Sequence, residues 1–557
     1  MLKVFLLGSL LFGSSYAAQI PRSSTYQTRH QARDQQDTSN QYITSQISAL
    51  AEESLKSSGT PGLSLGVVQL DPNTKALKTE FGAWGTWTED GDKTTQDVLF
   101  GIGSCSKAFL SAAMGILMDD FAQGKNVTSL PAGMGSFTWK TKVQELFPGE
   151  DSDWELMDEV ATKYTNIRDI LSHMTGLSRH ELSYAPSDTP QAVVRHMRYL
   201  RPLYEFRERW LYNNQMYIFG THIISTYAGK PFHQFVEERI FGSLNMTSTT
   251  YSGITASQSG KFSQAFTFYA NETRRIPFAF NTQALSDIVG GPGGIISNTV
   301  DMVKWMGMLL NNGTDPATGA TIIPPSVFAE VTTMRVVEDE TPPSPGLSIV
   351  GYGLGWEKAS IYGHELIGHD GGIPGFLTLV TLLPSDGVGI GKSGPTHARG
   401  ETLIDVFTKF TTRSVSRHLL QSRIRKLHAL RTNRYLRLLQ HYLIGFAKVF
   451  PDTPPPSQAA LYGTWPRVWS SHIQVLSTEN DTFLASFLGM YPDGYGKNTS
   501  PFYDGVTRGE ALAQFDIEGS TVKGLAVFED QGEADLPGSP PYTNLKEIAG
   551  VYYVKEG

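Results

Sequence analysis

The chain has 557 residues, a formal net charge of −8 and a single cysteine. This length exceeds what one hydrophobic core normally holds, so we expect one large domain and a smaller appended domain. The mildly acidic balance gives no general reason to expect a nucleic-acid partner. Because a disulfide needs two cysteines, the lone Cys105 excludes an intramolecular disulfide.

Residues 1–17 combine Lys3, an apolar run from Val4 to Phe12 and a small-residue exit at Ser15 to Ala17. This pattern predicts a cleaved secretory signal, and its apolar run is too short to span a membrane. Residues 18–41 are polar and predict a disordered lead-in. A secreted chain would expose its glycosylation acceptors of the form Asn-x-Ser/Thr, which are Asn126, Asn245, Asn271, Asn312, Asn480 and Asn498.

The first predicted elements are a helix from about Tyr42 to Lys56 and two strands, at Pro61–Leu70 and about Ala76–Ala83. Residues 62–66 match the G-x-S-x-G nucleophile elbow, whose serine must stand on a sharp turn between a strand and a helix. Ser64 instead lies inside a strand that runs into a hairpin. We therefore predict a structural role for Ser64.

A glycine- and serine-rich stretch, residues 101–107, precedes the apolar run from Ala108 to Leu117. The run is apolar on every side and predicts a buried helix with Ser104 at its start. Lys107 lies three residues further on and shares a helix face with Ser104, where an amine can help a serine hydroxyl lose its proton. A helix cap followed by a solvated lysine would give the same S-x-x-K pattern. Cys105 is interpreted as a small buried hydrophobic residue rather than a nucleophile.

The next two patterns are a histidine in a short helix and a Tyr-x-Asn pair. His173 belongs to a segment, residues 166–177, that closes on a glycine, and it is predicted to be a hydrogen-bonded structural histidine. Tyr212 and Asn214 stand in a loop that enters an apolar helix at Tyr217–Tyr227. This spacing can aim a phenol and an amide at one point.

Residues 286–296 contain a glycine run and predict a flexible or tightly turning connection ahead of a helix at Val300–Leu310. No Lys-Ser/Thr follows the glycines, so nucleotide binding is not expected. Further on, residues 364–369 resemble the zinc-binding H-E-x-x-H motif. The second histidine, His369, comes one residue too late to share the helix face of His364, and glycines crowd the segment, so no metal site is predicted.

Gly368 to Phe376 lead into a predicted strand at Leu377–Leu383, a turn at Pro384–Gly387 and a returning strand. Residues 403–450 form an atypical basic helical segment, which favours a solvated helix packed on its parent domain and leaves binding to an anionic surface as the alternative. Residues 451–456 are proline-rich and predict a stiff linker. Residues 457–557 predict a small β-rich domain, with strands at 513–517, 522–528 and 548–554.

Three elements now stand in order: Ser104-x-x-Lys107, Tyr212-x-Asn214 and His369-x-Gly371. Their order and wide spacing resemble the serine β-lactamase and penicillin-binding-protein superfamily. The flanking sequence is most similar to the class C β-lactamase, D-aminopeptidase and esterase branch, the peptidase family S12 type. The resemblance covers about residues 42–400. It implies an α/β plus all-α fold, an antiparallel sheet flanked by helices with a helical subdomain, in a catalytic domain that we place at residues 42–450.

The resemblance also implies roles for the site residues. Ser104 would be the acylated nucleophile, Lys107 and Tyr212 would move its proton, and Asn214 would contact substrate and Lys107. A tyrosine needs a nearby positive charge, such as that of Lys107, to act as a base at neutral pH. Backbone N–H groups of Ser104 and Gly372, beside Gly371, would form an oxyanion hole.

His369 occupies the position where many relatives carry lysine. An unperturbed histidine is mostly neutral at pH 7 and can donate one hydrogen bond. We therefore expect uncharged substrates to be preferred over substrates with a free carboxylate, and this preference to become weaker at acidic pH. Lys392-Ser393-Gly394 is a rival third motif. The turn at residues 384–387 places Lys392 opposite the middle of the strand at 377–383, away from His369, and the Gly-Phe pair that follows His369 favours the histidine.

The sequence therefore predicts a secreted serine hydrolase that needs no metal or cofactor and forms an acyl-enzyme on an ester, amide or lactam. One alternative is an acyltransferase of the same family in secondary metabolism, because water and an alcohol or amine can both resolve an acyl-enzyme. A second alternative is a catalytically silent penicillin-binding-like protein. The expected partner is a small molecule or a short peptide, with no nucleic acid and no transmembrane segment. The oligomeric state stays open.

Overall fold

The computed structural model describes residues 41–395, except 270–271 and 344–345, and most of residues 460–554. The predicted signal, the lead-in, the basic segment, the proline-rich linker and the acceptors Asn271 and Asn480 lie outside the described residues. No described helix is both long enough and apolar enough to cross a bilayer.

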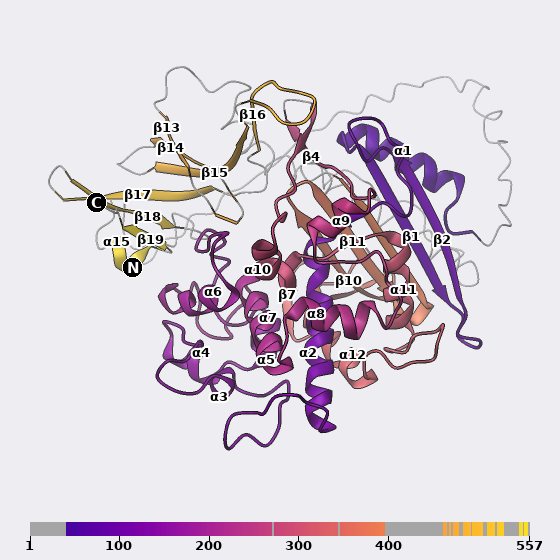
Figure 1. Cartoon of the computed structure of the whole chain (residues 1–557), viewed down its shortest axis with the longest axis horizontal. Coiled ribbons are helices and arrows are strands. Elements are labelled where there is room, and N and C mark those ends of the chain that lie inside the picture. The colour runs from indigo at the N-terminus through magenta and orange to yellow at the C-terminus, as the bar shows by residue number, and fades with distance from the viewer. Residues whose placement is uncertain are drawn as a thin grey trace, which may run out of the picture. The chain divides into compact units, whose positions relative to one another are not determined.

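Two strands and most of the helices come first in the chain, and the remaining strands of the main sheet follow as one run from β7 to β12 (Figure 1). The helices are α1 Ser45–Ser58, α2 Ser106–Ala122, α3 Val143–Leu146, α4 Glu159–Tyr164, α5 Ile167–Leu171, α6 Pro190–His196, α7 Asn214–Ala228, α8 Phe232–Val236, α9 Gly253–Gln258, α10 Gln283–Gly293, α11 Thr299–Leu310, α12 Pro325–Val331 and α15 Leu545–Ile548. Shorter turns of helix are η1 Gly103–Cys105, η2 Met197–Tyr199, η3 Glu237–Phe241 and η4 Pro384–Asp386. The strands are β1 Gly62–Leu70, β2 Leu77–Gly85, β3 Phe100–Gly101, β4 Ala265–Tyr269, β5 Glu272–Ile276, β6 Ile296–Ser297, β7 Val336–Asp339, β8 Val350–Tyr352, β9 Glu357–Ile361, β10 His364–Ile373, β11 Phe376–Leu383, β12 Val388–Gly394, β13 Ala460–Thr464, β14 His472–Ser477, β15 Phe483–Tyr491, β16 Phe502–Asp504, β17 Glu510–Glu518, β18 Thr521–Phe528 and β19 Val551–Val554.

The main sheet of the described residues has eight strands in the order β2-β1-β12-β11-β10-β9-β8-β7, and each neighbouring pair is antiparallel. Helix α11 packs on β1 and β12. Glycines make this contact close, because a Cβ built on Gly66 would lie 2.9 Å from Val303 and one on Gly391 would lie 3.0 Å from Met306. The predicted strands at 61–70 and 76–83 correspond to β1 and β2.

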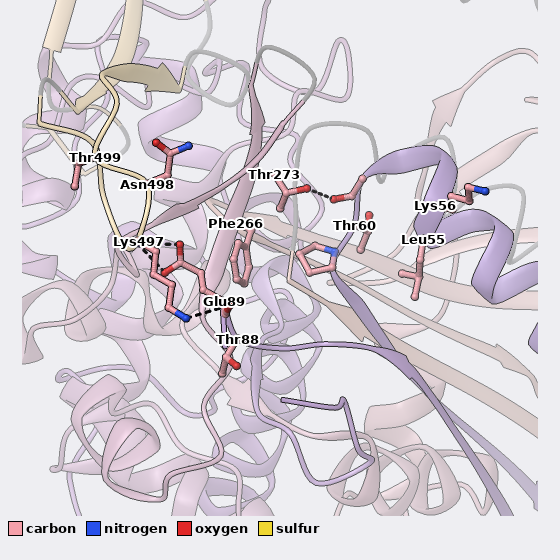
Figure 2. Close-up of a pocket in the computed structure, with 12 residues that line it drawn as sticks. Leu55, Lys56, Thr60, Thr88, Glu89, Phe266, Thr273, Lys497, Asn498 and Thr499 are labelled. Atoms are coloured by element: carbon pink, nitrogen blue, oxygen red, sulfur yellow. Dashed lines mark hydrogen bonds between the residues drawn. The ribbon is translucent and has the colours of Figure 1, made fainter. Parts of the chain in front are cut away.

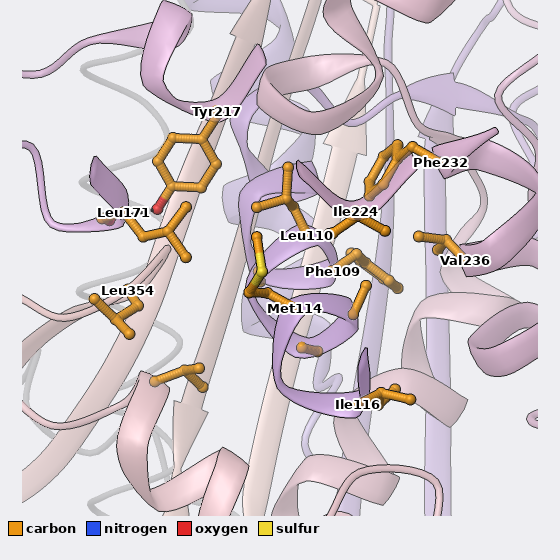
Figure 3. Close-up of a cluster of buried hydrophobic side chains, with 14 of the residues drawn as sticks. Phe109, Leu110, Met114, Ile116, Leu171, Tyr217, Ile224, Phe232, Val236 and Leu354 are labelled. Atoms are coloured by element: carbon orange, nitrogen blue, oxygen red, sulfur yellow. Dashed lines mark hydrogen bonds between the residues drawn. The ribbon is translucent and has the colours of Figure 1, made fainter. Parts of the chain in front are cut away.

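Helix α2 is the central helix of the domain and contacts α7, α10 and α12. It buries 14 of its 17 residues, which confirms the prediction of a helix that is apolar on every side. Phe109 stacks on Trp305 with 3.9 Å between ring centroids. Figure 3 shows side chains of α2, including Leu110 and Met114, surrounded by apolar residues from other helices such as Ile224 and Phe232. This packing holds the start of α2 in a fixed place.

The glycine run of residues 290–294 differs from its prediction. The sequence predicted a flexible or tightly turning connection, whereas residues 283–293 form helix α10. The glycines serve close packing, because a Cβ on Gly291 would lie 2.4 Å from the Thr221 hydroxyl and 2.8 Å from the Tyr217 carbonyl on α7. Pro292 lies inside this helix, one residue before its end, and has no N–H to donate to the carbonyl of Ile288.

The C-terminal residues form a second sheet with the order β13-β14-β15-β17-β18-β19, in which β16 also pairs with β15. Strands β17, β18 and β19 correspond to the three predicted strands, although the last begins at Val551 because residues 545–548 form α15. The β-rich character of this region is therefore confirmed. The fold class predicted from the sequence is confirmed as well, with a large antiparallel sheet, flanking helices and a separate β-rich C-terminal region.

Candidate active site

Ser104 lies in the short helical turn η1, directly ahead of α2, and Lys107 is the second residue of α2. The Lys107 Nζ atom is 3.0 Å from Ser104 Oγ. Gly103 reaches the turn with φ of +52°, in the left-handed region that a glycine adopts without strain. The sequence spacing had placed Ser104 and Lys107 on one helix face, and the two side chains do lie within hydrogen-bond distance.

Lys107 is fully buried, at 0% exposure, and contacts three oxygen atoms. Its Nζ donates to Asn214 Oδ1 at 2.7 Å and to the Pro292 carbonyl at 2.8 Å. Both oxygens can only accept, so each of them takes one N–H group of Lys107. The third position on the Lys107 nitrogen faces Ser104. Burial, followed by the positive charge of Arg179, lowers the pKa of Lys107 well below its usual value. In its neutral form Lys107 would direct its lone pair at the Ser104 hydroxyl, whereas in its charged form it donates to Ser104 Oγ.

Tyr212 stands in the loop before α7, and its hydroxyl donates to Ser104 Oγ at 2.7 Å. The Lys107 nitrogen lies 4.7 Å from the centroid of the Tyr212 ring. Burial raises the pKa of Tyr212 well above its usual value, and this effect outweighs the hydrogen bond with Ser104 and the charge of Arg179. The sequence led us to expect a phenol made basic by a charged lysine, whereas the structure favours a neutral phenol beside a neutral amine.

Asn214 is the first residue of α7, and Asn213 caps this helix by accepting from the Met216 N–H. The Asn214 amide is held at both ends, because its oxygen faces Lys107 and its Nδ2 donates to Glu181 Oε1 at 2.7 Å. The other carboxylate oxygen of Glu181 accepts from the Tyr184 hydroxyl at 2.6 Å. Glu181 lies in a loop without a periodic pattern, so no sequence signal pointed to it.

The backbone of β10 passes directly against the turn that carries Ser104. A Cβ on Gly371 would lie 2.0 Å from the Ile102 carbonyl, and a Cβ on Gly103 would lie 2.8 Å from the Gly372 nitrogen. Only glycine fits at such distances. The Gly372 amide is therefore adjacent to the turn of Ser104, where the two backbone N–H groups can serve a common anion.

His369 is 1% exposed and lies on the same strand. Its Nδ1 is 2.6 Å from the Asp370 carbonyl oxygen, which can only accept, so Nδ1 carries the proton. Its Nε2 is 3.0 Å from the Tyr352 hydroxyl, which then donates to it. The neutral ring has no N–H left for a substrate, in contrast to the single donor expected from the sequence. Burial lowers the pKa of His369 to about 4.

Lys392 lies on β12, two strands from His369. In the register of the sheet, Lys392 pairs with Leu379, whereas His369 pairs with Val380 and Val380 pairs with Gly391. Because neighbouring residues of a strand point to opposite faces, the side chains of Lys392 and His369 face opposite sides of the sheet. Leu379 is in the middle of β11, as the sequence indicated.

Three donor groups that could hold a metal, those of Glu357, His369 and Asp370, lie within 4.8 Å of one another. Nδ1 of His369 carries the proton, and Nε2 accepts a hydrogen bond from Tyr352. The ring therefore has no electron pair for a metal in this state. The H-E-x-x-H-like segment is the strand β10 rather than the helix that such a zinc motif requires.

Ser64 and Cys105 are both buried, and each has a partner that fits a structural role. Ser64 Oγ lies 3.0 Å from the Thr299 hydroxyl inside β1. The Cys105 thiol donates to the His369 carbonyl at 3.2 Å, and burial raises its pKa, which favours the unreactive thiol.

Two further sets of residues are the predicted glycosylation acceptors and the lining of a surface pocket. The four described acceptors of glycosylation are exposed, and these are Asn126, Asn245, Asn312 and Asn498. A surface pocket of about 770 Å³ has Glu89 and Lys497 among its lining residues (Figure 2). Its other lining residues include neither Ser104 nor the residues that contact it.

A family model described as Beta-lactamase matches residues 47–392. Among curated proteins, the chain is 31% identical over 338 residues to "Unguisins hydrolase ungD'" of Aspergillus campestris, covering 59% of this chain and 57% of that protein. It is 29% identical over 362 residues to "Unguisins hydrolase ungD" of Aspergillus violaceofuscus, covering 60% of this chain and 58% of that protein. The matched part therefore spans little more than half the length of these relatives.

Two solved structures resemble the fold. The octameric penicillin-binding protein homologue from Pyrococcus abyssi superposes with a TM-score of 0.52 at 14% identity, covering 87% of this chain and 96% of that one. The D-amino acid amidase from Ochrobactrum anthropi SV3 superposes with a TM-score of 0.51 at 19% identity, covering 67% and 100%. The family match spans more than half of the chain and includes Ser104, Lys107, Tyr212 and His369, so the chain belongs to the beta-lactamase family.

Proposed function

We propose that the chain is a serine hydrolase that forms an acyl-enzyme on Ser104 with an ester, amide or lactam substrate. The observation that carries the proposal is the environment of Ser104 Oγ, which lies 3.0 Å from Lys107 Nζ and 2.7 Å from the Tyr212 hydroxyl. A serine between a buried amine and a part-buried phenol has both a proton acceptor and a proton donor. The named hydrolases among the family relatives support hydrolysis as the reaction class.

The first half of the reaction uses the lone pair of Lys107. Lys107 takes the Ser104 proton as Oγ attacks the substrate carbonyl carbon, and the carbonyl π electrons move to its oxygen. The N–H groups of Ser104 and Gly372 stabilise this oxyanion, an effect typically worth ~10²–10³ in rate for each donor. When the tetrahedral intermediate collapses, the Tyr212 phenol gives its proton to the leaving group and recovers one from the Lys107 ammonium.

The second half reverses these transfers with water. The neutral Lys107 amine and the Tyr212 phenol are restored after the first half, so they can activate a water molecule that attacks the acyl carbonyl. Ser104 leaves with the proton of that water, and the acid product is released. Glu181 would keep the Asn214 amide, and through it Lys107, in place during both halves.

An uncharged amide or ester fits this site better than a carboxylate substrate. The side chain that replaces the usual lysine, His369, is neutral, buried and already hydrogen-bonded. The name of the D-amino acid amidase favours an amide among these substrates. We further propose that the protein is secreted, because residues 1–17 have the pattern of a signal peptide.

The test is a panel of matched amide, ester and lactam substrates, each offered to the wild-type protein and to Ser104→Ala. We expect release of the free acid from amides or esters, with loss of release in Ser104→Ala. The same reactions with a competing alcohol report acyl transfer as a mixed ester product. Absence of any Ser104-dependent product with every substrate, from protein that is folded, would favour a silent binding protein and contradict the proposal.

A further inference from the structure

His173 lies in the turn that follows α5 and has φ of +62°, a conformation that is unfavourable for a residue with a side chain. Two hydrogen bonds accompany this conformation. Its carbonyl oxygen accepts from the Leu211 N–H at 3.0 Å. Its ring Nδ1 accepts from the Asn213 N–H at 3.1 Å. Leu211 and Asn213 are the residues on either side of Tyr212, so His173 holds the peptide backbone both before and after this tyrosine.

The ring of His173 is completely buried and contacts the Tyr212 ring, with 4.6 Å between the centroids. It also packs against Tyr217 and Tyr352. Because Nδ1 accepts a hydrogen bond, the proton of the neutral ring is on Nε2. Nε2 has no hydrogen-bond partner among the described residues.

A buried donor without a partner destabilises the folded state, so an apolar side chain would fill this space at lower cost. The feature that an apolar side chain cannot supply is the acceptor for the Asn213 N–H. Burial lowers the pKa of His173 well below its usual value, which keeps the Nδ1 lone pair available.

Tyr212 needs such support because it stands in a loop rather than in a helix or strand. Its hydroxyl must stay 2.7 Å from Ser104 Oγ to transfer a proton. We propose that His173 is a positioning residue that holds the Tyr212 phenol against Ser104 by accepting hydrogen bonds from the backbone on both sides of Tyr212. This inference rests on the proposed acylation of Ser104.

Two substitutions separate the acceptor from the bulk of the ring. His173→Phe keeps an aromatic ring without an acceptor. His173→Asn loses the ring but can place an amide oxygen near the Nδ1 position, and asparagine tolerates positive φ. The readout is the rate at which a fluorophosphonate labels Ser104, with circular dichroism and thermal unfolding to confirm folding. We expect His173→Phe to slow labelling by ~10–10²-fold, the scale of a misplacement of about 1 Å, and His173→Asn to stay within about threefold of wild type.

A double-mutant cycle with Tyr212→Phe shows whether His173 acts through the phenol. In the Tyr212→Phe background the hydroxyl is already absent, so His173→Phe should cause no further loss of labelling. An equal loss in both backgrounds, or a loss in His173→Asn as large as in His173→Phe, would overturn the inference. If His173→Phe does not fold, a loss of more than about tenfold in His173→Asn overturns it and near-wild-type labelling supports it. Wild-type protein that is not labelled at all would instead contradict the proposed function.

Discussion

Acidification should destabilise this protein through His369. The ring is 1% exposed and neutral in the folded state, where burial lowers its pKa to about 4 from the ordinary 6.5. As the pH falls from 6.5 toward 4, the unfolded chain binds a proton that the folded chain does not, so folding stability falls. A difference of about 2.5 pKa units at ~1.4 kcal/mol each predicts a loss of ~3 kcal/mol, complete below about pH 4.

The perturbation is His369→Phe, which removes the titrating group and keeps a ring of similar size. The assay is the free energy of unfolding by urea, measured in steps from about pH 7.5 to about pH 3.5. Whatever the stability of the variant at pH 7, its free energy of unfolding should fall by ~3 kcal/mol less than that of wild type over this range. His196→Gln removes an exposed histidine from α6 and serves as the matched control. Identical pH dependence in wild type and His369→Phe would refute the reasoning.

The same pKa corrects an expectation drawn from the sequence. With an ordinary pKa, His369 would be largely protonated at pH 5 and would attract a substrate carboxylate there. With a pKa of about 4, the ring stays mostly neutral at pH 5. The preference between a carboxylate substrate and its methyl ester should therefore not change through His369 between about pH 8 and about pH 5.

Three further predictions concern Ser104 and its surroundings. Tyr212→Phe should lower turnover by ~10²–10⁴ with little change in stability, and normal steady-state turnover would assign proton transfer to Lys107 alone. Gly371→Ala should abolish Ser104 labelling, because its Cβ would lie 2.0 Å from a backbone oxygen, whereas Gly135→Ala, in open space, should label normally; equal labelling of the two variants would contradict the close approach of β10. Ser64→Ala should keep wild-type labelling, and equal loss in folded Ser64→Ala and Ser104→Ala variants would show that the structural role assigned to this serine is wrong.

The sequence could predict those parts of the site that depend on local geometry. Residues three apart share a helix face, so the proximity of Ser104 and Lys107 followed from their spacing. The Tyr212-x-Asn214 pair could be placed at the start of an apolar helix, and the structure begins α7 at Asn214. The offset of Lys392 from His369 followed from the length of the turn between two strands.

Other parts depended on contacts between distant residues. The carbonyl of Pro292 contacts Lys107 because the glycines beside it let α10 approach α7, and the sequence alone indicated a loop there. Glu181 comes from an irregular loop, so its contact with Asn214 had no pattern to reveal it. The Tyr352 hydroxyl, which lies two strands away, donates a hydrogen bond to Nε2 of His369. This bond changes the role expected for that histidine.

The central claim is that Ser104 carries the acyl group. The most direct measurement is the intact mass of the protein mixed with a slowly deacylated ester, followed by mapping of the modified peptide. The account predicts one acyl adduct on the peptide that contains Ser104 and no adduct on folded Ser104→Ala. An adduct on another residue, or hydrolysis by Ser104→Ala at the wild-type rate, would contradict it.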